Sequence, residues 1–562
     1  MRAIDYFEHH KVMLEQALEA CRVRHYWSPF QESPASRFHP EGAKAKGKRR
    51  FDSALNTRFE LVQPDTTGWV GAEVSPYTRQ HLGITYAQST ADAYFKSALK
   101  ALPAWKALSP KERVGICLEM LQRCDRQGFE NLFATMHTAG MPFTMAFAGA
   151  GANALDRGLE ALCYAYKAMD DVPSTATFQR RFGQGQSAHL QKRYRLTPRG
   201  VAVVICCGTF PTWNAYPAIM ANLATGNPVI VKPHPNGILP MAFVVKACQA
   251  LLMELGLSPH LITLAPDEPQ SPITRDLIQH PSCAIVDFTG SPRFGEWIES
   301  NIRHAQVYTE TAGCNAIVID STDDFSGMIK AIGQSLCLFS SQMCTSPQNI
   351  YISRDGIETD EGHLSLRDVT AALAGQINHF VEAPKTAAAL CGAVMSPRTL
   401  KAIERLSERC RGDIIRPSSS YAHPDFPDAQ TATPFLAYAK DTIHHEEHFG
   451  PMAFVVPSED SHHALEQAAR LAQSRGSIAA YAYSTNEDFI AHIEDRYAEA
   501  GASIGINLCT QLPINFTAAY SDYHVTGLNP AGNACLTDLA FVANRFRIVQ
   551  SKREYHSTKA PN

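Results

Sequence analysis

The sequence predicts an α/β protein with two doubly wound units, each a parallel sheet covered by helices on both faces, together with a β-hairpin arm. Three observations support this prediction. Short apolar runs alternate with helix-length stretches after Arg199, a second alternation begins at Ala316, and apolar residues recur with helical spacing over 90–169. Strands that alternate with helices are typical of parallel, doubly wound sheets. Two such units favour a binding site in the cleft between them.

The elements follow in chain order. A short N-terminal helix precedes the polar, basic segment 32–50, which contains Pro and Gly and which we expect to be a solvated connection. Residues 90–169 should form a helical layer, because their apolar residues recur at three- and four-residue spacing. The segment 178–199 predicts a hairpin inserted before the first sheet, and we expect this arm to pack on a neighbouring subunit.

The strands of both sheets are expected in short apolar runs. Those of the first sheet are VAVVICC, NPVIVKP, LITLAP and CAIVDFTGS, and those of the second are AIVID, QNIYIS, AFVVP, IAAYAY and SIGIN. The predicted organisation is an N-terminal extension (1–60), a first α/β domain (61–177 and 200–311), a second α/β domain (312–515) and an arm (178–199 and 516–562).

Composition excludes several classes of protein. The 562 residues are 45% hydrophobic and 19% charged with a formal net charge of −4, so neither nucleic acid nor an anionic membrane surface is an expected partner. We expect a cytoplasmic protein, because charged residues and histidines interrupt the N-terminal segment and no apolar run is long enough to span a membrane. The 15 cysteines should be reduced thiols.

The strongest chemical signal is a series of short motifs in a fixed order, and the first two lie where strands end. CCGTFPTWN (206–214) directly follows the strand VAVVI, and VIVKP places Lys232 at the end of the next strand. Polar groups at the carboxyl ends of parallel strands face the binding crevice of such sheets. We therefore expect Lys232 to meet a ribose or a phosphate.

Three further motifs follow along the chain. FTGSPRFG (288–295) joins a strand through a turn at Gly290 to a helix that opens at Ser291, and the N-terminal amides of such a helix are suited to a pyrophosphate. ETAGC begins at Glu310, and SSQMC ends at Cys344.

Together with EEHFGP (446–451), this ordered set resembles the aldehyde dehydrogenase superfamily from about Thr90 to the C-terminus. The resemblance implies an NAD(P)-binding first domain and a catalytic second domain. It implies that Cys344 attacks the aldehyde carbon as a thiolate, giving a hemithioacetal that loses hydride to the nicotinamide and becomes a thioester. Glu310 is then the base that activates water for hydrolysis, so the product is a carboxylate.

The resemblance also implies the cofactor contacts. Lys232 holds the adenosine ribose, and three positions on, where NAD-preferring members usually carry a glutamate, this chain has Pro235. Without that negative charge a 2′-phosphate is tolerated, so NADP or NAD is the expected cofactor, with Lys232 and His234 as candidates to meet the phosphate. Glu447 and Phe449 are expected to position the nicotinamide ribose and ring. Further cofactor contacts are expected from Gly290, Ser291 and Gly295.

Two segments depart from the superfamily pattern. Thr209 replaces the asparagine whose amide completes the oxyanion hole, and loss of such a donor costs about 2.7–4 kcal/mol in other enzymes. Either Thr209 substitutes, Asn214 swings in, or the enzyme is slow on ordinary aldehydes. The second departure is 519–553, which replaces the usual glycine-rich lysine–serine segment. Both departures resemble a branch of the superfamily from bacterial phenylacetate degradation, which implies a semialdehyde of the opened ring as substrate, with or without attached coenzyme A.

Two alternative functions stay open. The replacement at Thr209 would also fit a catalytically weak homologue that serves as a binding or scaffold protein. The motif HHEEH would fit a zinc hydrolase with His444 and His448 as ligands, although Gly450 and the proline after it should stop the helix that this motif needs. The aldehyde dehydrogenase interpretation requires no metal and favours a homodimer or homotetramer.

We do not expect the remaining motif matches to be functional, because their context is wrong. GAGANA and GQGQSA do not lie between a strand and a helix, as a dinucleotide-binding loop requires, and GASIG has its helix before the serine rather than after it.

Overall fold

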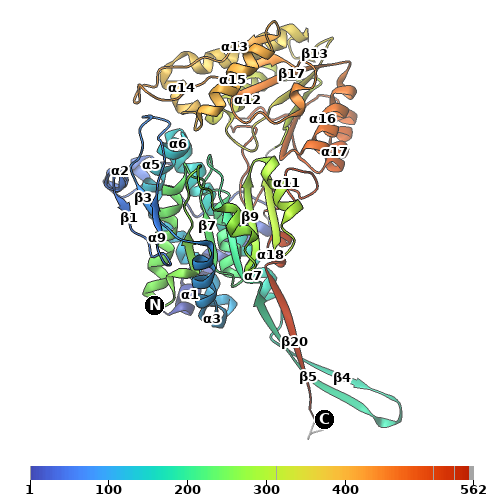
Figure 1. Cartoon of the computed structure of the whole chain (residues 1–562). Coiled ribbons are helices and arrows are strands. Elements are labelled where there is room, and N and C mark those ends of the chain that lie inside the picture. Colours follow the sequence, from blue (N-terminus) through green and yellow to red (C-terminus); the bar gives the residue numbers. More distant parts are fainter. Residues whose placement is uncertain (1, 312, 511, 537, 556–562) are drawn as a thin grey trace.

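The computed structural model describes residues 2–311, 313–510, 512–536 and 538–555. Figure 1 shows two α/β domains, one mostly blue to green and one mostly yellow to orange, with a thin β-arm that leaves the first. This architecture confirms the predicted fold class. No helix within the described residues is long and apolar enough to cross a membrane.

The first domain is built on a five-stranded parallel sheet in the order β10-β9-β6-β7-β8. Its central strand is buried at every residue, as expected for a parallel strand covered on both faces. The strands are β6 (Val201–Ile205), β7 (Val229–Lys232), β8 (Ile262–Leu264), β9 (Cys283–Gly290) and β10 (Gln306–Thr311). The order doubles back beside β6, and the carboxyl ends of strands at such a reversal form a ligand-binding crevice.

Helices surround this sheet, and those of the predicted layer over 90–169 are present. They are α3 (Ala91–Ala107), α4 (Pro110–Asp125), α5 (Gly128–Ala139), α6 (Phe143–Phe147), α7 (Asn153–Asp170), α8 (Ala215–Ala224), α9 (Ile238–Glu254), α10 (Thr274–Gln279) and α11 (Pro292–Asn301). The glycines of GAGANA lie in a π-helical turn that runs straight into α7, so they do not form a phosphate loop. A small sheet of β1 (Arg58–Phe59), β3 (Thr85–Gln88) and β2 (Gly68–Val70) flanks the domain.

The second domain contains a seven-stranded sheet in the order β15-β16-β17-β12-β11-β18-β19, parallel except for the edge strand β15. Its strands are β11 (Ala316–Ile319), β12 (Asn349–Ser353), β15 (Ile414–Arg416), β16 (Phe435–Tyr438), β17 (Met452–Ser458), β18 (Ala479–Tyr483) and β19 (Ser503–Ile506). Its helices are α12 (Phe325–Cys337), α13 (Leu366–Glu382), α14 (Pro384–Cys391), α15 (Pro397–Arg409), α16 (Ser461–Arg475) and α17 (Glu487–Ala500), and a hairpin joins β13 (Ile357–Thr359) to β14 (Gly362–Leu364). The serine of GASIG begins β19, which excludes a nucleophile elbow there.

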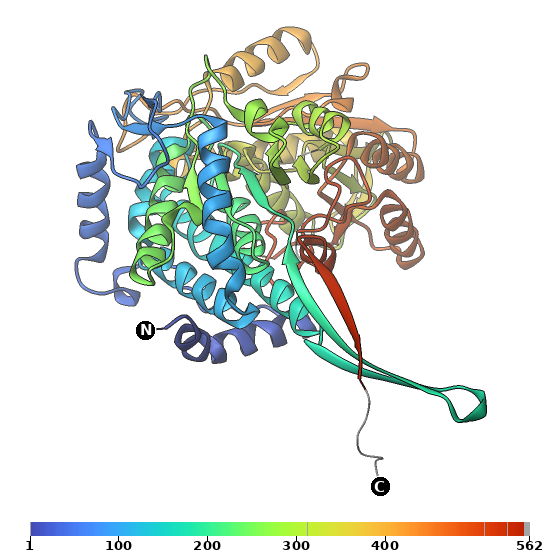
Figure 2. The same ribbon diagram turned by 60° about the horizontal axis from the view of Figure 1, so that its bottom comes forward.

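The arm is a three-stranded antiparallel sheet in the order β20-β5-β4, and Figure 2 shows it projecting far from the body. Its strands are β4 (Thr175–Arg181), β5 (Ser187–Pro198) and β20 (Phe546–Glu554), with the short helix α18 (Leu539–Ala543) before the last strand. At the base of the arm, the buried Arg545 guanidinium forms a bidentate pair with Asp287 of β9 at 2.6 and 2.8 Å. The predicted hairpin is therefore present, and the C-terminal strand completes it.

The expectation of a solvated connection over 32–50 is wrong for its second half. Residues of this segment enter α2 (Ala43–Ala54), which packs on α5 with Gly47 and Phe51 buried. An added Cβ at Gly47 would lie 2.4 Å from the Phe129 Cβ, so glycine permits a close approach of the two helices. The basic residues had suggested a loop, whereas those over 44–50 lie on the exposed face of this helix. The first helix of the extension, α1 (Ala3–Val23), packs on α4 and α7.

Candidate active site

A cleft of about 770 Å³ lies between the two domains. It receives side chains from the carboxyl ends of β6, β7 and β9 in the first domain and from loops of the second. Its lining contains almost every residue that the sequence singled out, namely Cys344, Glu310, Thr209, Asn214, Lys232, Pro235, Gly290, Ser291, Glu447 and Phe449. The position of these residues at one cleft is the arrangement that the motif order predicts.

Cys344 lies on a loop that directly follows a strained turn. Phe339, Ser340 and Ser341 all adopt left-handed backbone conformations with φ near 50°, which cost roughly 1–2 kcal/mol per residue. Side chains hold this turn: the Ser340 hydroxyl donates to the Cys391 carbonyl at 3.1 Å, and the Ser341 hydroxyl donates to a carbonyl of α12 at 2.7 Å. The cysteine is thereby presented to the cleft from a rigid loop.

Glu310 reaches the same point from the first domain, near the end of β10, and its carboxylate accepts two hydrogen bonds. The Asn214 amide donates to Oε2 at 2.8 Å, and His524 Nε2 lies 3.0 Å from Oε1. The amide of Asn214 is therefore engaged by the predicted base. Thr209 is buried in the cleft wall, and its part in an oxyanion hole stays a prediction.

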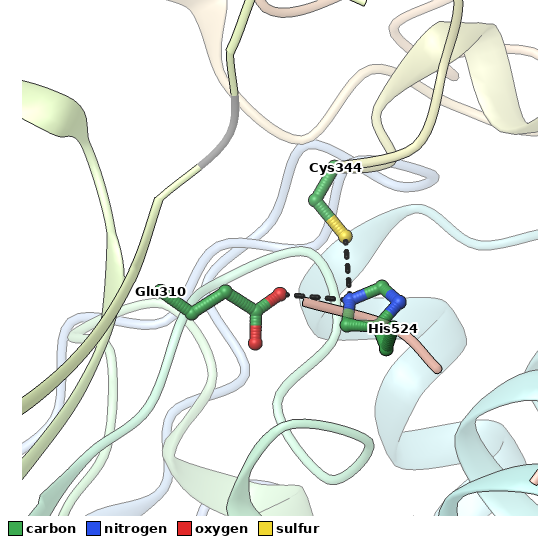
Figure 3. Close-up of side chains that lie close together, drawn as sticks. All are labelled: Glu310, Cys344 and His524. Carbon is green, nitrogen blue, oxygen red and sulfur yellow. Dashed lines mark hydrogen bonds and ion pairs between the residues drawn. The ribbon is translucent and has the colours of Figure 1, made fainter. Parts of the chain in front are cut away.

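The sequence analysis missed His524. Figure 3 shows its imidazole between Glu310 and Cys344, with Nε2 3.7 Å from the Cys344 Sγ. It belongs to the segment 519–553, whose departure from the superfamily pattern was noted without weighing any residue within it. The lone histidine has no periodicity or motif that marks it as functional, and it lies 180 positions from Cys344 along the chain. The sequence feature that could have drawn attention to His524 was the departure of its segment from the superfamily pattern.

The surroundings of Cys344 favour its protonated form. Burial raises the pKa of its thiol well above the ordinary value, and the nearby Glu310 carboxylate raises it further because it repels a thiolate. The thiol of Cys207 acts in the same direction. A group that accepts the proton or stabilises the thiolate is therefore needed before Cys344 can act as a nucleophile.

At the other end of the cleft, Lys232 is already paired. Its ammonium lies 2.8 Å from Asp267 Oδ1 and donates to the Pro233 carbonyl at 2.6 Å, while burial lowers its pKa. Burial also lowers the pKa of His234 to about 4, so this imidazole is neutral at pH 7. Neither predicted contact for a 2′-phosphate is a free cation. Arg398, near the start of α15, is exposed and lines the cleft together with Pro235.

The glycine-rich turn after β9 leads into α11 as predicted. Ser291 is the N-cap and lines the cleft with Gly290, so the amides of the first turn face the space that a pyrophosphate would need. Gly295 lies outside the lining of the cleft. An added Cβ there would lie 2.7 Å from the Thr311 Cγ2, so this glycine serves the close packing of α11 on β10.

The side chain of Glu447 changes its charge near neutral pH, because burial raises its pKa to about 7. An ionised carboxylate accepts hydrogen bonds from ribose hydroxyls more strongly than a neutral acid does. If Glu447 holds a ribose, NADH should bind about tenfold more tightly at pH 8 than at pH 6, because the carboxylate ionises across this window. Fluorescence titration measures the Kd, and Glu447→Gln should remove the pH dependence. A flat profile in the unmodified protein would contradict the assignment.

Within the described part of the chain, one group of side chains has the spacing of metal ligands. The ligand atoms of Glu310, Cys344 and His524 all lie within 4.8 Å of one another. His444 and His448 are not part of it: a 3-10 turn over Ile443–His445 gives way to extended backbone, so the α-helix that a zinc motif requires is absent. The His448 Nε2 instead lies 2.9 Å from the Ile443 carbonyl.

Comparison with curated proteins gives distant relatives. The 1-pyrroline-5-carboxylate dehydrogenase of Staphylococcus epidermidis is 26% identical over 358 residues, or 58% of this chain and 64% of the relative. That of Bacillus licheniformis is 25% identical over 57% of this chain and 62% of the relative. The matches thus span less than two thirds of the length of these relatives.

Solved structures match over a greater length. The crystal structure of an NAD-dependent aldehyde dehydrogenase from Burkholderia multivorans is 41% identical and covers 99% of both chains, with a TM-score of 0.96. A 1-pyrroline-5-carboxylate dehydrogenase from Thermus with bound NAD has a TM-score of 0.71 at 18% identity, covering 94% of this chain and 100% of its own. The model of the aldehyde dehydrogenase family matches residues 67–517. The chain therefore belongs to the aldehyde dehydrogenase family.

Proposed function

We propose that the protein oxidises an aldehyde to a carboxylate with NAD or NADP. The observation that carries this proposal is the meeting of Cys344 and Glu310, from different domains, at one wall of the cleft between them. The other residues of the cleft suit a dinucleotide: a helix N-terminus at Ser291 for the pyrophosphate and the carboxylate of Glu447 for a ribose. When bound, the nicotinamide supplies the hydride acceptor.

Cys344 and Glu310 then carry out the steps of the reaction. The Cys344 thiol gives its proton to Glu310, and the sulfur attacks the aldehyde carbon to form a hemithioacetal whose oxygen is an alkoxide. Loss of hydride from that carbon leaves a thioester on Cys344. Glu310, after releasing its proton to solvent, takes a proton from water as the hydroxide adds to the thioester carbonyl. Cleavage of the carbon–sulfur bond releases the carboxylate and restores Cys344.

Glu310→Gln tests the base. The variant lacks the group that receives the Cys344 proton, so its single hydride transfer should be slower, and NAD(P)H should still appear to at most one equivalent per site. Steady-state turnover should then fall by about 10²–10⁴-fold, the usual contribution of a general base, because the thioester accumulates. Stopped-flow absorbance and mass spectrometry of the acylated Cys344 peptide would measure both effects.

Glu358→Gln, on the exposed β13 strand, is the matched control and should behave as the unmodified protein. Full steady-state turnover in Glu310→Gln would show that another group activates water. Tight cofactor binding without hydride transfer from any aldehyde in the unmodified protein would instead favour the catalytically weak homologue.

NADP acceptance is proposed to depend on Arg398. With Lys232 paired and His234 neutral, Arg398 is the cation that lines the corner of the cleft beside Pro235. Arg398→Ala should raise the KM for NADP roughly tenfold and leave that for NAD unchanged, since only NADP carries the 2′-phosphate. Steady-state kinetics with both cofactors measure this. Arg405→Ala, an exposed arginine on the same helix, is the control, and an equal change for both cofactors would refute the role of Arg398.

For the substrate, we propose a semialdehyde of an opened aromatic ring, with or without attached coenzyme A. The support is the resemblance of CCGTFPTWN and SDYHVTGLNPAGNACLTD to the phenylacetic acid degradation protein PaaN. The relevant measurement is kcat/KM over a panel that contains ring-opened semialdehydes, their coenzyme A thioesters and 1-pyrroline-5-carboxylate. A preference for the last compound would overturn the proposed substrate and leave the reaction class intact.

We also propose that the arm joins subunits into a homodimer or homotetramer. It carries large apolar side chains in solvent, among them Phe178, Phe182, Ile548 and Val549, with exposed fractions of 36–54%. Apolar groups gathered on a projecting sheet favour burial against another chain.

A further inference from the structure

We propose that His524 is a positioning residue of the active site, whose Nε2–H holds the Glu310 carboxylate in place and donates a hydrogen bond to the Cys344 thiolate. This inference rests on the proposed function for its catalytic meaning. The geometry behind it is independent of any substrate. A single nitrogen lies 3.0 Å from Glu310 Oε1 and 3.7 Å from Cys344 Sγ, and the side chain is 2% exposed or less (Figure 3).

The position of the proton on His524 follows from its neighbours. Glu310 as a carboxylate and Cys344 as a thiolate can only accept hydrogen bonds, so the Nε2 atom that faces both must carry the hydrogen. The other ring nitrogen, Nδ1, is buried without a hydrogen-bond partner among the described residues. A hydrogen placed on Nδ1 would therefore be unsatisfied, and the arrangement favours the tautomer that carries its hydrogen on Nε2.

The other side of the imidazole packs against an aromatic ring. The Trp213 ring packs edge-on against His524 with centroids 4.6 Å apart, and the guanidinium of Arg157 lies over that indole at 5.2 Å. The charged and titratable groups around the imidazole are thus Glu310, Cys344 and, behind Trp213, Arg157. Glu310 and Cys344 both lie on the Nε2 side.

Contacts of the residues just before His524 anchor its segment to the first domain. The Tyr520 hydroxyl donates to Asp156 of α7 at 3.1 Å, and Arg157 of the same helix donates to the Asp522 carbonyl at 3.1 Å. The N-terminal extension supports the segment as well, because Trp27 packs on the Tyr520 ring at 5.4 Å. The segment that departs from the family pattern and the extension therefore form one structure that delivers His524.

Glu310 and His524 therefore have opposite effects on the Cys344 thiolate. Burial and the Glu310 charge disfavour the Cys344 thiolate, and a hydrogen bond from His524 offsets part of that penalty. The same N–H, with the Asn214 amide on the other oxygen, keeps Glu310 beside the thiol whose proton it receives. Loss of the Nε2–H should therefore make Cys344 less reactive near neutral pH.

The decisive experiment compares His524→Asn with His524→Gln. The glutamine amide nitrogen can take the place of Nε2, whereas that of asparagine corresponds to Nδ1 and does not reach the two acceptors. The rate of Cys344 alkylation by iodoacetamide is followed from pH 6 to pH 10, in the presence of a chelator, by mass spectrometry of the Cys344 peptide. His524→Asn should slow the reaction about tenfold near pH 7, as a rise of one unit in the thiol pKa would, and His524→Gln should restore most of the rate.

His524→Leu, which has no donor, should behave like His524→Asn, and His423→Gln is the control at a buried histidine that does not line the cleft. Cofactor binding, measured by fluorescence, establishes that each variant is folded. Coincident profiles for the unmodified protein, His524→Asn and His524→Leu would overturn the proposal. Alkylation needs no aldehyde, so the result stands even if the proposed oxidation fails. With a turned-over aldehyde, the loss in His524→Asn should fall on kcat rather than KM.

Discussion

Cys344→Ala should abolish aldehyde-dependent NAD(P)H formation, with a fall in kcat of at least roughly 10⁴-fold. Nucleophile removal in a well-studied hydrolase costs about 2 × 10⁶ in kcat. Cys206 lines the cleft as well, and burial raises the pKa of its thiol, so it is not suited to take over. Cys207, which also lines the cleft, donates to the Phe210 carbonyl at 3.3 Å, and burial raises its pKa to about 12. The measurement is NAD(P)H absorbance over a panel of aldehydes.

Cofactor binding should survive this substitution, because Cys344 does not hold the dinucleotide in the proposed mechanism. Cys509→Ala, at a half-buried cysteine that does not line the cleft, should keep full activity and so controls for the loss of a thiol. Retained activity in Cys344→Ala would contradict the assignment of Cys344 as the nucleophile and of Glu310 as the group that receives its proton.

Arg545→Ala should lower the free energy of unfolding by about 3–5 kcal/mol, the cost of leaving one member of a buried ion pair alone. The guanidinium is fully buried, pairs with both oxygens of Asp287, and donates to the Asn222 side chain at 3.0 Å. The rings of Tyr308 and Phe541 lie on it, each with its centroid at 4.1 Å. Removing Arg545 leaves the buried Asp287 carboxylate without its counter-charge, although the Asn222 amide still donates to it at 2.8 Å, and removes an ion pair at the base of the arm.

Urea unfolding followed by circular dichroism measures the change. Arg547→Ala is the matched control, because this arginine lies two residues on in β20 and is exposed, so its loss should cost less than about 0.5 kcal/mol. Asp287→Asn with Arg545→Ala should recover part of the loss, since the stranded charge is gone. Equal stability of the Arg545→Ala and Arg547→Ala variants would show that the ion pair does not hold the arm.

Most of the fold was predictable because its signals are local. The strand VAVVI is an uninterrupted run of β-rich apolar residues, and the structure buries all of it in the first sheet. The prediction of a loop over 32–50 was wrong because the signal for its structure is not local. The basic residues over 44–50 lie on a helix that buries only a narrow face, which includes Gly47 and Phe51. Composition alone does not distinguish such a helix from a loop.

The site divides in the same way. By itself the sequence determined the family and the two α/β domains and singled out Cys344 and Glu310 as candidates, because family motifs are short, contiguous and ordered. Only the tertiary structure decided that Lys232 is neutralised by Asp267, that Asn214 holds Glu310, and that His524 lies between the base and the thiol. These are contacts between residues far apart in the chain, which packing alone brings within hydrogen-bonding distance, and no local pattern of residues encodes such a distance.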